Sequence, residues 1–552
     1  MKRTTLICLA LSGLLATAGA RDIHVDGAAP AGNGSPDAPF NAIQPALDIA
    51  GAGDVIHIAP GTYAMSGSLQ TVRDGTKANP ITVRAADAGN RPIITSPLSE
   101  LTIDNSNMVF ENLILDGDFD NSDVVRIRSG GDNAVLRNCE IRNGTKDGID
   151  MNEADDVLIE SCEIHHMLGG SYSNQVDAHG IVATGQLNLT IRNCDIYYVS
   201  GDCFQTDPGR GYPLWDNVLI EGGRFWTGPL PGDAADWNAG EIPGENGVDT
   251  KINGDAVGNG YRPVIVIRDL EAFGWEPGYI NNRAALNIKE NVECLIERVK
   301  VYDSEIAFRL RGPGSRGGAR VTIKNAIAYG NEKTFRTEDG IENLKIYNST
   351  FARPSGGDWF QNAGGGYDGA TFDMRNCLFV GDKPSDADHA SNLTASLAFF
   401  LDGAAFDFHL IAGSPAIDAG VTIASVDQDY DRNPRPAGLG FDVGAFEFGL
   451  TTGLETPVAA EGFALDANYP NPFNPETVLP FRLERASRVT LTVYNLLGQP
   501  VRRLVDAPMS PGEYRITWNG VDDQGRPMAS GVYLYRLQVD GRVATRSMHL
   551  VR

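Results

Sequence analysis

Four ionisable residues near the middle of the chain, Asp207, Asp249, Lys251 and Lys289, have the types and spacing for acid–base chemistry. They lie in short segments in which apolar and polar residues alternate. Six such segments can be aligned: residues 149–152, 181–184, 204–207, 248–251, 286–289 and 308–311. Because the side chains of an extended chain alternate between two faces, the first and third residues of each segment are predicted to face a core and the second and fourth to face solvent.

The outward residues of these segments form two columns if the segments stack as neighbouring strands about 4.8 Å apart. One column contains Asp150, Val182, Gln205, Asp249, Asn287 and Arg309, and the other contains Asn152, Thr184, Asp207, Lys251, Lys289 and Arg311. This surface changes from acidic at the earlier segments to basic at the later ones. Such a surface suits β-elimination on an acidic polysaccharide, in which a base removes the proton beside a uronate carboxylate whose charge has been neutralised.

The aspartates of this surface are candidate calcium ligands. Asp207 and Asp249 lie one segment apart and would hold a Ca²⁺ ion, because Ca²⁺ prefers carboxylate oxygens. Asp150, or Asp177 on the incoming loop, would supply a further ligand. The bound ion would neutralise the substrate carboxylate as a Lewis acid, so we expect Ca²⁺ as a cofactor.

The cations of the surface are candidate catalytic and binding residues. Lys251 is the predicted base, since the ammonium group of Lys289 one segment away would favour the neutral amine of Lys251. Lys289 and Arg309 are grouped with Lys251 as catalytic residues. Arg309 and Arg311 would also bind carboxylates further along the sugar chain.

Two residues on the flanking loops are expected to contact the substrate. His179 lies in the sequence Asp177-Ala178-His179-Gly180 and could act as a base or as a substrate contact, with a structural role as the alternative. Trp237 lies in a long loop over residues 227–245, where an aromatic ring could stack on a sugar. The alternative is that the tryptophan holds this loop down by packing.

Three other interpretations stay open at this stage. The aspartates and lysines could be exposed ion pairs of little energetic effect, about 0–1 kcal/mol each. The chain could be a glycoside hydrolase on the same fold that uses paired carboxylates such as Asp207 and Asp249. It could also be a non-catalytic protein that binds glycans at a cell surface.

A sequence repeat predicts the elements that position these residues. The phrase apolar-x-apolar-x-Asn/Ser-Cys-acidic-apolar is centred on Leu136, Ile159 and Ile191, and weaker copies continue to Met374 at intervals of roughly 23–47 residues. These intervals are too short for βαβ units and predict the coils of an all-β parallel solenoid, in which each coil buries the apolar face of the next.

The same repeat predicts what occupies the turns and the core. Asparagine tolerates the left-handed backbone that a sharp turn requires. We expect an internal asparagine ladder made of Asn112, Asn138, Asn193, Asn325, Asn348 and Asn376. The cysteines of the repeat are expected to be buried thiols rather than disulfides or metal ligands.

The opening of the mature chain resembles a known superfamily. Residues 41–50 are amphipathic and precede a strand at 55–58 and the sequence Pro60-Gly61-Thr62-Tyr63. This stretch resembles the start of secreted right-handed parallel β-helix proteins of the pectate-lyase-like superfamily, and the resemblance extends over residues 21–450. It implies a right-handed β-helix with an N-terminal capping helix.

A second resemblance concerns catalysis. The phrase Glu245-Asn246-Gly247-Val248-Asp249-Thr250-Lys251 is similar to the region of β-helical polysaccharide lyases of families six and nine that holds the calcium ligands and the lysine base. The resemblance implies that Asp249 or Glu245 is a metal ligand and that Lys251 is the base. The run of clustered aspartates found in family nine is absent here.

Both ends of the chain resemble export signals. Residues 1–20 have a positive start, an apolar middle and a small-residue cleavage site, as a signal peptide does. After a closing segment at 414–447 and a linker at 451–465, residues 466–552 resemble the immunoglobulin-like sorting domain of type IX secretion. This resemblance implies the type IX machinery as a partner and a secreted or cell-surface location.

Within the closing segment, residues 427–433 alternate oxygen ligands like a calcium loop, but a solvated loop is the alternative.

Charge and composition restrict the partners. The chain has 71 acidic and 46 basic side chains, a net charge of −25, which argues against a nucleic-acid partner. After the signal peptide no apolar run is long enough for a transmembrane helix. We therefore expect an exported monomer that acts on an acidic polysaccharide.

Overall fold

The computed structural model describes residues 19–207, 215–252, 261–312, 317–353, 357–449, 463–465, 468, 473–483, 485–495, 500–529, 531–539 and 542–550. The chain divides into two compact units. The first comprises Met1–Tyr430 and Gly440–Phe446, and the second comprises Asp431–Leu439 and Glu447–Arg552. No helix among the described residues has the length and apolar character needed to cross a membrane.

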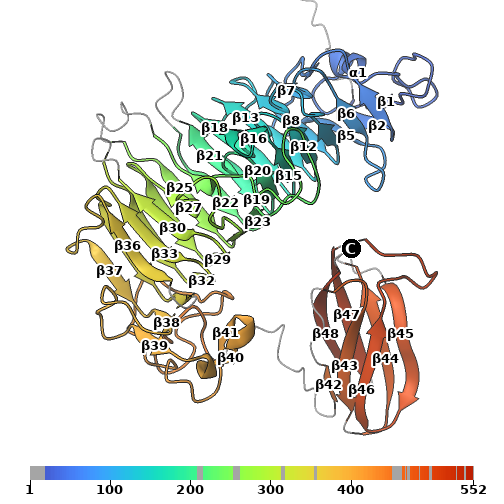
Figure 1. Ribbon diagram of the computed structural model, residues 1–552. Coiled ribbons are helices and arrows are strands. Elements are labelled where there is room, and N and C mark those ends of the chain that lie inside the picture. Colours follow the sequence, from blue (N-terminus) through green and yellow to red (C-terminus); the bar gives the residue numbers. More distant parts are fainter. Residues whose placement is uncertain are drawn as a thin grey trace, which may run out of the picture. The chain divides into compact units, whose positions relative to one another are not determined.

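The first unit is a parallel β-helix with three long sheets, here called sheets I, II and III (Figure 1). One coil illustrates the pattern. Its strand in sheet I is β11 (Val135–Arg137), its strand in sheet II is β12 (Glu140–Gly144), and its strand in sheet III is β13 (Ile149–Asn152). Each strand pairs in parallel with the equivalent strands of the coils before and after it. The expected solenoid architecture is therefore confirmed.

Sheets I and II run nearly the whole length of this unit. Sheet I contains β1 (Asp22–Val25), β2 (Val55–Ile58), β5 (Ile81–Ala85), β8 (Met108–Glu111), β11, β14 (Leu158–Glu160), β19 (Thr190–Arg192), β22 (Val218–Glu221), β25 (Val264–Arg268), β28 (Glu293–Glu297), β31 (Arg320–Lys324), β34 (Asn343–Tyr347) and β37 (Phe372–Arg375). Sheet II contains β3 (Thr62–Ala64), β6 (Ile93–Thr95), β9 (Ile114–Asp116), β12, β15 (Glu163–Met167), β20 (Asp195–Val199), β23 (Arg224–Trp226), β26 (Glu271–Phe273), β29 (Lys300–Tyr302), β32 (Ile327–Tyr329), β35 (Thr350–Ala352), β38 (Leu378–Val380) and β39 (Leu393–Ala395).

Sheet III contains the six aligned segments. Its strands are β4 (Leu69–Gln70), β7 (Leu101–Ile103), β10 (Val125–Ile127), β13, β18 (Ile181–Thr184), β21 (Phe204–Asp207), β24 (Asn246–Asp249), β27 (Ala284–Ile288), β30 (Ile306–Arg311), β33 (Lys333–Glu338) and β36 (Asp358–Ala363). Two loops enter this sheet with structure of their own. One carries the hairpin of β16 (Gly169–Ser171) and β17 (Asn174–Val176), and the other spans residues 227–245, between β23 and β24.

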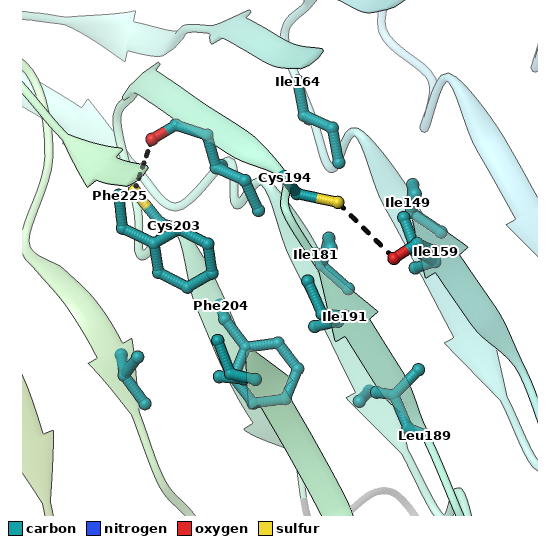
Figure 2. Packing of buried hydrophobic residues seen from close by; sticks show 14 of the residues in the cluster. Ile149, Ile159, Ile164, Ile181, Leu189, Ile191, Cys194, Cys203, Phe204 and Phe225 are labelled. Carbon is teal, nitrogen blue, oxygen red and sulfur yellow. Dashed lines mark hydrogen bonds between the residues drawn. The ribbon is translucent and has the colours of Figure 1, made fainter. Parts of the chain in front are cut away.

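The interior is filled by the inward residues of the three sheets. In sheet III these include Ile149, Ile181, Phe204, Val248 and Leu286, all fully buried. Figure 2 shows Ile149, Ile181 and Phe204 with residues of the other two sheets in this core. The described cysteines are all buried free thiols, which confirms the prediction for Cys139, Cys162 and Cys194 and holds also for Cys203, Cys294 and Cys377. Cys194, for example, donates to the carbonyl of Ile159 in the preceding coil, at 3.5 Å (Figure 2).

The N-terminal end of the β-helix is capped as expected. Helix α1 (Gln44–Ile49) buries Ala46 and Leu47 and contacts β1 and β4, which are edge strands of sheets I and III. Covering these edges prevents them from pairing with another chain.

The asparagine turns are partly as predicted. All six asparagines have the expected left-handed backbone, with φ between 46° and 59°. The prediction of an internal ladder is wrong for the first three asparagines, because Asn138 and Asn193 are exposed and Asn112 is half-buried. The last three, Asn325, Asn348 and Asn376, are buried because the closing segment covers them. Their side-chain amides donate to the carbonyls of Gln428, Asp442 and Val421 at 2.8, 3.1 and 2.8 Å.

Beyond β39 the first unit ends in short elements. These are η1 (Leu397–Phe399), β40 (Phe400–Asp402), η2 (Gly403–Ala405) and β41 (Asp407–Leu410).

The second unit is a small antiparallel sandwich. One sheet contains β42 (Phe463–Leu465), β43 (Thr477–Leu483) and β46 (Gly512–Trp518), and the other contains β45 (Pro500–Met509), β44 (Ser487–Tyr494), β47 (Gly531–Val539) and β48 (Arg542–Leu550). Trp518, Leu491 and Tyr535 are fully buried in the core of this unit. The immunoglobulin-like sandwich expected at the C-terminus is thus present.

Candidate active site

The register predicted for sheet III is the one observed. Asp150, Val182, Gln205, Asp249, Asn287 and Arg309 are paired in consecutive strands in this order. In the second column Asn152, Thr184 and Asp207 are paired in the same way. Lys251 and Lys289 lie two residues and one residue beyond the ends of β24 and β27 rather than within these strands.

Two buried threonines fix the backbone at these lysines. The hydroxyl of Thr206 donates to the carbonyl of Lys251 at 3.1 Å and accepts from its N–H at 2.8 Å. Thr250 holds Lys289 in the same way, at 2.9 and 2.8 Å. Both threonines are inward residues with no exposed surface. Each therefore continues the stacking of the coils where the strand pairing has ended, which holds both lysines above the same face of the sheet.

Asp249 is the centre of the charged group. Its Oδ1 accepts from the Nδ2 amide of Asn287 at 2.9 Å, and its Oδ2 accepts from the ammonium of Lys289 at 2.8 Å. The ammonium of Lys251 lies 3.8 Å from the same Oδ2 and donates to the amide oxygen of Gln205 at 2.5 Å. Two ammonium groups thus share one carboxylate, and the charge of Glu245 also interacts with both lysines.

The exposure of these groups differs from the expectation. Asp249 is 3% exposed although it lies in an outward column, because neighbouring side chains cover it. The side chain of Lys289 is 17% exposed and that of Lys251 is 32% exposed. Lys251 is therefore the amine of this group that a ligand would meet first. The direct Lys289–Asp249 pair also means that the charge of Lys289 is mostly compensated and is not directed at Lys251.

The aspartates predicted as calcium ligands do not form a site that fits Ca²⁺. Both carboxylate oxygens of Asp249 are already engaged by an amide and an ammonium group. Asp150 is paired with Arg128 at 3.2 Å, and Asp177 is exposed on the loop that follows β17. Among the described residues, no three acidic, histidine or cysteine side chains lie close enough together to bind a metal ion. This finding covers both Asp207 with its neighbours and residues 427–433.

A row of buried polar residues lies at the start of the sheet III strands. His179 donates its backbone N–H to Asp147 Oδ1 at 2.8 Å, and its Nδ1 accepts the N–H of Asp202 at 2.8 Å. Asn246 Nδ2 donates to Asp202 Oδ1 at 2.8 Å. Of the residues in this row, only His179 is a site residue predicted from the sequence. The available signal was that Asp147, His179, Asp202 and Asn246 each precede the first inward residue of an aligned segment by two positions.

The protonation states of this row follow from burial. Burial lowers the pKa of His179 to about 4, despite the nearby carboxylates of Asp177 and Asp207. Its Nδ1 is an acceptor, so the neutral ring carries its proton on Nε2 and can donate a hydrogen bond but cannot take up a proton there. Burial, followed by the charges of Asp249 and Glu245, raises the pKa of Asp202 well above the usual range. His179 is thus a positioned hydrogen-bond donor, and its predicted role as a base is not supported.

The predicted role of Trp237 is wrong. The ring is 1% exposed and packs against Leu168 and Leu230, with Tyr172 at a ring-centroid distance of 6.2 Å. The tryptophan therefore holds the long loop against the coil below, which was the alternative interpretation. Sequence alone does not distinguish the two roles, because both place an aromatic residue on a loop.

A cluster of arginines lies at the basic end of sheet III. Glu338, which is 5% exposed, is contacted by Arg309 through Nε and Nη2 at 3.1 and 3.2 Å and by Arg311 through Nε at 2.8 Å. Arg336 Nε also donates to Glu338. Burial alone would raise the pKa of Glu338, but the three arginines outweigh burial and hold it below its usual value. Arg336 and Glu338 were missed because the alignment ended at residue 311, although residues 335–338 continue the same pattern.

Comparisons with known proteins agree with the two folds. Residues 23–222 match a family described as "Pel9A-like, right handed beta helix region", and residues 475–542 match a family described as "FlgD Ig-like domain". The first match identifies the solenoid as a right-handed β-helix, in agreement with the expected fold class. No curated protein matches the chain.

Solved structures that match this chain include proteins of different activities. A pectate lyase Pel9A is 18% identical over 77% of this chain and 96% of its own, with a TM-score of 0.43. A rhamnogalacturonan lyase is 14% identical over 69% and 91%, with a TM-score of 0.46. A GH136 lacto-N-biosidase from Eubacterium ramulus is 13% identical over 64% and 68%, with a TM-score of 0.42. At these identities the similarity concerns the fold alone.

Proposed function

We propose that this chain is a polysaccharide lyase that cleaves a uronate-containing polysaccharide by β-elimination, with Lys251 as the base. The observation that carries the proposal is the group formed by Lys251, Lys289 and Asp249 on the outward face of sheet III. It places the amine of Lys251, the more exposed of the two lysines, beside the Lys289–Asp249 ion pair. The match of residues 23–222 to a Pel9A-like β-helix region supports the same class of protein.

The ammonium group of Lys289 is suited to an anionic sugar. A uronate carboxylate placed beside Lys289 would be partly neutralised by this cation, and neutralising that carboxylate makes the proton on the adjacent carbon more acidic. The free amine of Lys251 would take this proton. The electrons of the C–H bond then form a carbon–carbon double bond, and the glycosidic oxygen on the next carbon leaves with the rest of the chain.

The surrounding residues position the amine. Gln205, which is 5% exposed, accepts the hydrogen bond of Lys251, and Thr206 fixes the backbone of the lysine. A side chain held in this way loses little further entropy when substrate binds. Arg309 lies two coils from Asp249 and binds Glu338 with two nitrogens, so its position favours substrate binding over a direct role in catalysis.

The hydrolase interpretation is less well supported by this arrangement. Hydrolysis of a glycosidic bond needs one carboxylic acid and one carboxylate that are available to the substrate. Asp249 is buried, and both of its oxygens are occupied by Asn287 and Lys289.

The experiment that tests the proposal is a screen of the mature protein on pectate, alginate and glycosaminoglycans. Cleavage by elimination gives a product that absorbs in the near ultraviolet. We expect Lys251→Ala to lower the rate by about 10²–10⁴-fold, as loss of a general base does. Lys345→Ala, at an exposed lysine of sheet I, is the matched control and is expected to retain full activity.

The outcomes of this screen separate the candidate functions. New reducing ends without ultraviolet absorbance would identify a hydrolase. Binding of a glycan that is never cleaved and does not depend on Lys251 would identify a surface-binding protein. The arrangement of the described aspartates does not support the predicted calcium dependence, and activity that survives a chelator would exclude it.

We also propose that the protein is exported. Residues 1–20 would direct it out of the cytoplasm, and the C-terminal sandwich would be recognised by the type IX secretion machinery, giving a secreted or cell-surface monomer. Deleting residues 466–552 in the native host is expected to retain the protein inside the cell envelope. Light scattering of the secreted form would test the monomeric state.

A further inference from the structure

The arginine cluster around Glu338 contains more hydrogen-bond donors than the residues near it can satisfy. Arg309, Arg311 and Arg336 each carry five N–H donors, and a carboxylate has about four acceptor sites. The other neighbours are the carbonyl of Asn282, which accepts from Arg309 at 3.1 Å, and Gln361 Oε1, which accepts from Arg336 at 2.6 Å.

The cluster is also positively charged. Asp339 lies 3.7 Å from Arg311 and is exposed, so among the described residues two carboxylates face three guanidinium groups and one positive charge is left over. The three side chains are 16%, 28% and 17% exposed, which places them partly within reach of a ligand. Glu338 orders the three guanidinium groups, so little side-chain entropy remains to be lost when an anion binds.

The cluster lies in register with the proposed catalytic group. Asp249 is paired with Asn287, Asn287 with Arg309, and Arg309 with Arg336. At about 4.8 Å per coil, Arg309 is about 10 Å and Arg336 about 14 Å along the sheet from Asp249. One sugar of an extended polysaccharide is about as long as the spacing between two coils. The cluster therefore lies two to three sugar units from the sugar beside Lys251.

We infer that Arg309, Arg311 and Arg336 form a binding subsite for the carboxylate of a second uronate, two to three units from the cleaved bond. A planar carboxylate matches the paired N–H groups of a guanidinium. This inference rests on the proposed function for the position of the cleaved bond. It specifies the substrate as a chain of several acidic sugars, not a polymer with isolated uronates.

Binding of defined oligosaccharides to the Lys251→Ala variant, measured by calorimetry, tests the inference without cleavage. The ligands are uronate oligomers of two and of five units, and the five-unit oligomer with its carboxyl groups reduced to alcohols. We expect the five-unit acid to bind at least tenfold more tightly than either of the others. Adding Arg311→Gln or Arg336→Gln is expected to remove about tenfold of this affinity, as loss of a charged hydrogen bond does.

Controls separate a local effect from unfolding and from failure of the proposed function. Arg320→Gln changes an ion-paired arginine of sheet I and is expected to leave binding unchanged, while thermal unfolding shows whether each variant is folded. If Arg311→Gln and Arg336→Gln are folded and bind normally, the subsite is excluded, whether or not the protein is a lyase. If they lose binding but the wild type cleaves no uronate polymer, the subsite stands and the proposed lyase activity fails. If the wild type binds no uronate oligomer, both fail.

Discussion

Asp249 neutralises two ammonium groups, so substitutions within this group are expected to have unequal effects on stability. Replacing Asp249 by Asn retains an oxygen for the amide of Asn287 but leaves Lys289 and Lys251 as two neighbouring cations without a carboxylate. Replacing Lys289 by Met leaves Asp249 with Lys251, whose ammonium lies 3.8 Å away. The first change therefore creates unpaired charge, and the second leaves a possible pair.

The distances give the size of the difference. At an effective dielectric constant of 20, unit charges attract by roughly 6 kcal/mol at 2.8 Å and roughly 4 kcal/mol at 3.8 Å, before desolvation is subtracted. Breaking a buried ion pair by removing one partner costs about 3–5 kcal/mol, which we expect for Asp249→Asn. Because Lys251 can still neutralise the carboxylate, Lys289→Met is expected to cost about 1–3 kcal/mol. The double variant should be more stable than Asp249→Asn alone, since it buries one cation fewer.

Urea unfolding of the mature protein measures these differences. The chain has two compact units, so the transition of the β-helix unit must be followed by itself and its midpoints compared. The four proteins form a double-mutant cycle whose coupling energy reports the interaction between Asp249 and Lys289. Equal and additive effects of the two single substitutions would refute the shared carboxylate. So would a stabilisation of the wild type by Ca²⁺ that Asp249→Asn abolishes, because the carboxylate would then bind a metal ion and not the ammonium groups.

Three further predictions concern the β-helix unit. Burial, with the neighbouring acidic side chains, raises the pKa of Asp147 from 3.8 to about 7, so the stability contributed by its protonated form is complete below pH 3.8 and lost as the pH rises through 7. Asp147→Asn should therefore raise the unfolding temperature at pH 8 and leave it nearly unchanged at pH 4, and the opposite order would contradict this assignment. Asn376→Ala should cost about 2–4 kcal/mol in urea unfolding, because it removes the bonds to Val421 and puts alanine, which tolerates a left-handed backbone less well than asparagine, at a φ of 55°. Asn376→Gly should recover about 1 kcal/mol of that loss, since glycine adopts this φ without strain. The buried thiols should not react with a thiol reagent until the protein unfolds, and a fast-reacting cysteine in the native protein would show that the coils open locally.

Much of the fold could be predicted from the sequence because its determinants are local and repeated. Alternation with period two identifies which side chains of each strand face inward, and the Asn turns set where each coil bends. The observed pairing of Asp150, Gln205, Asp249 and Arg309 along sheet III follows from these two patterns alone. A register error of one residue would have placed polar side chains in the core of every coil, which is why the register is so strongly specified.

The side-chain partners could not be predicted in the same way. The alignment places Lys251 and Lys289 in one column and suggests that they interact with each other, with the ion pairs Asp249–Lys289 and Asp207–Lys251 as the alternative. The structure has the Asp249–Lys289 pair, and the ammonium of Lys251 lies 3.8 Å from the same carboxylate. Loop packing decided that Trp237 is buried and that Nδ1 of His179 is already used as an acceptor. These outcomes depend on distances of a few ångströms between residues about 20–40 positions apart.

The sequence by itself therefore determined a right-handed β-helix, the register of its third sheet and the face on which the charged residues gather. The tertiary structure alone decided which charges neutralise one another, which aspartates remain available for a metal ion, and that three arginines share Glu338. The physical reason is that strand register is fixed by a pattern repeated in every coil. An ion pair depends on how two particular side chains and the loops over them fill the space between neighbouring coils.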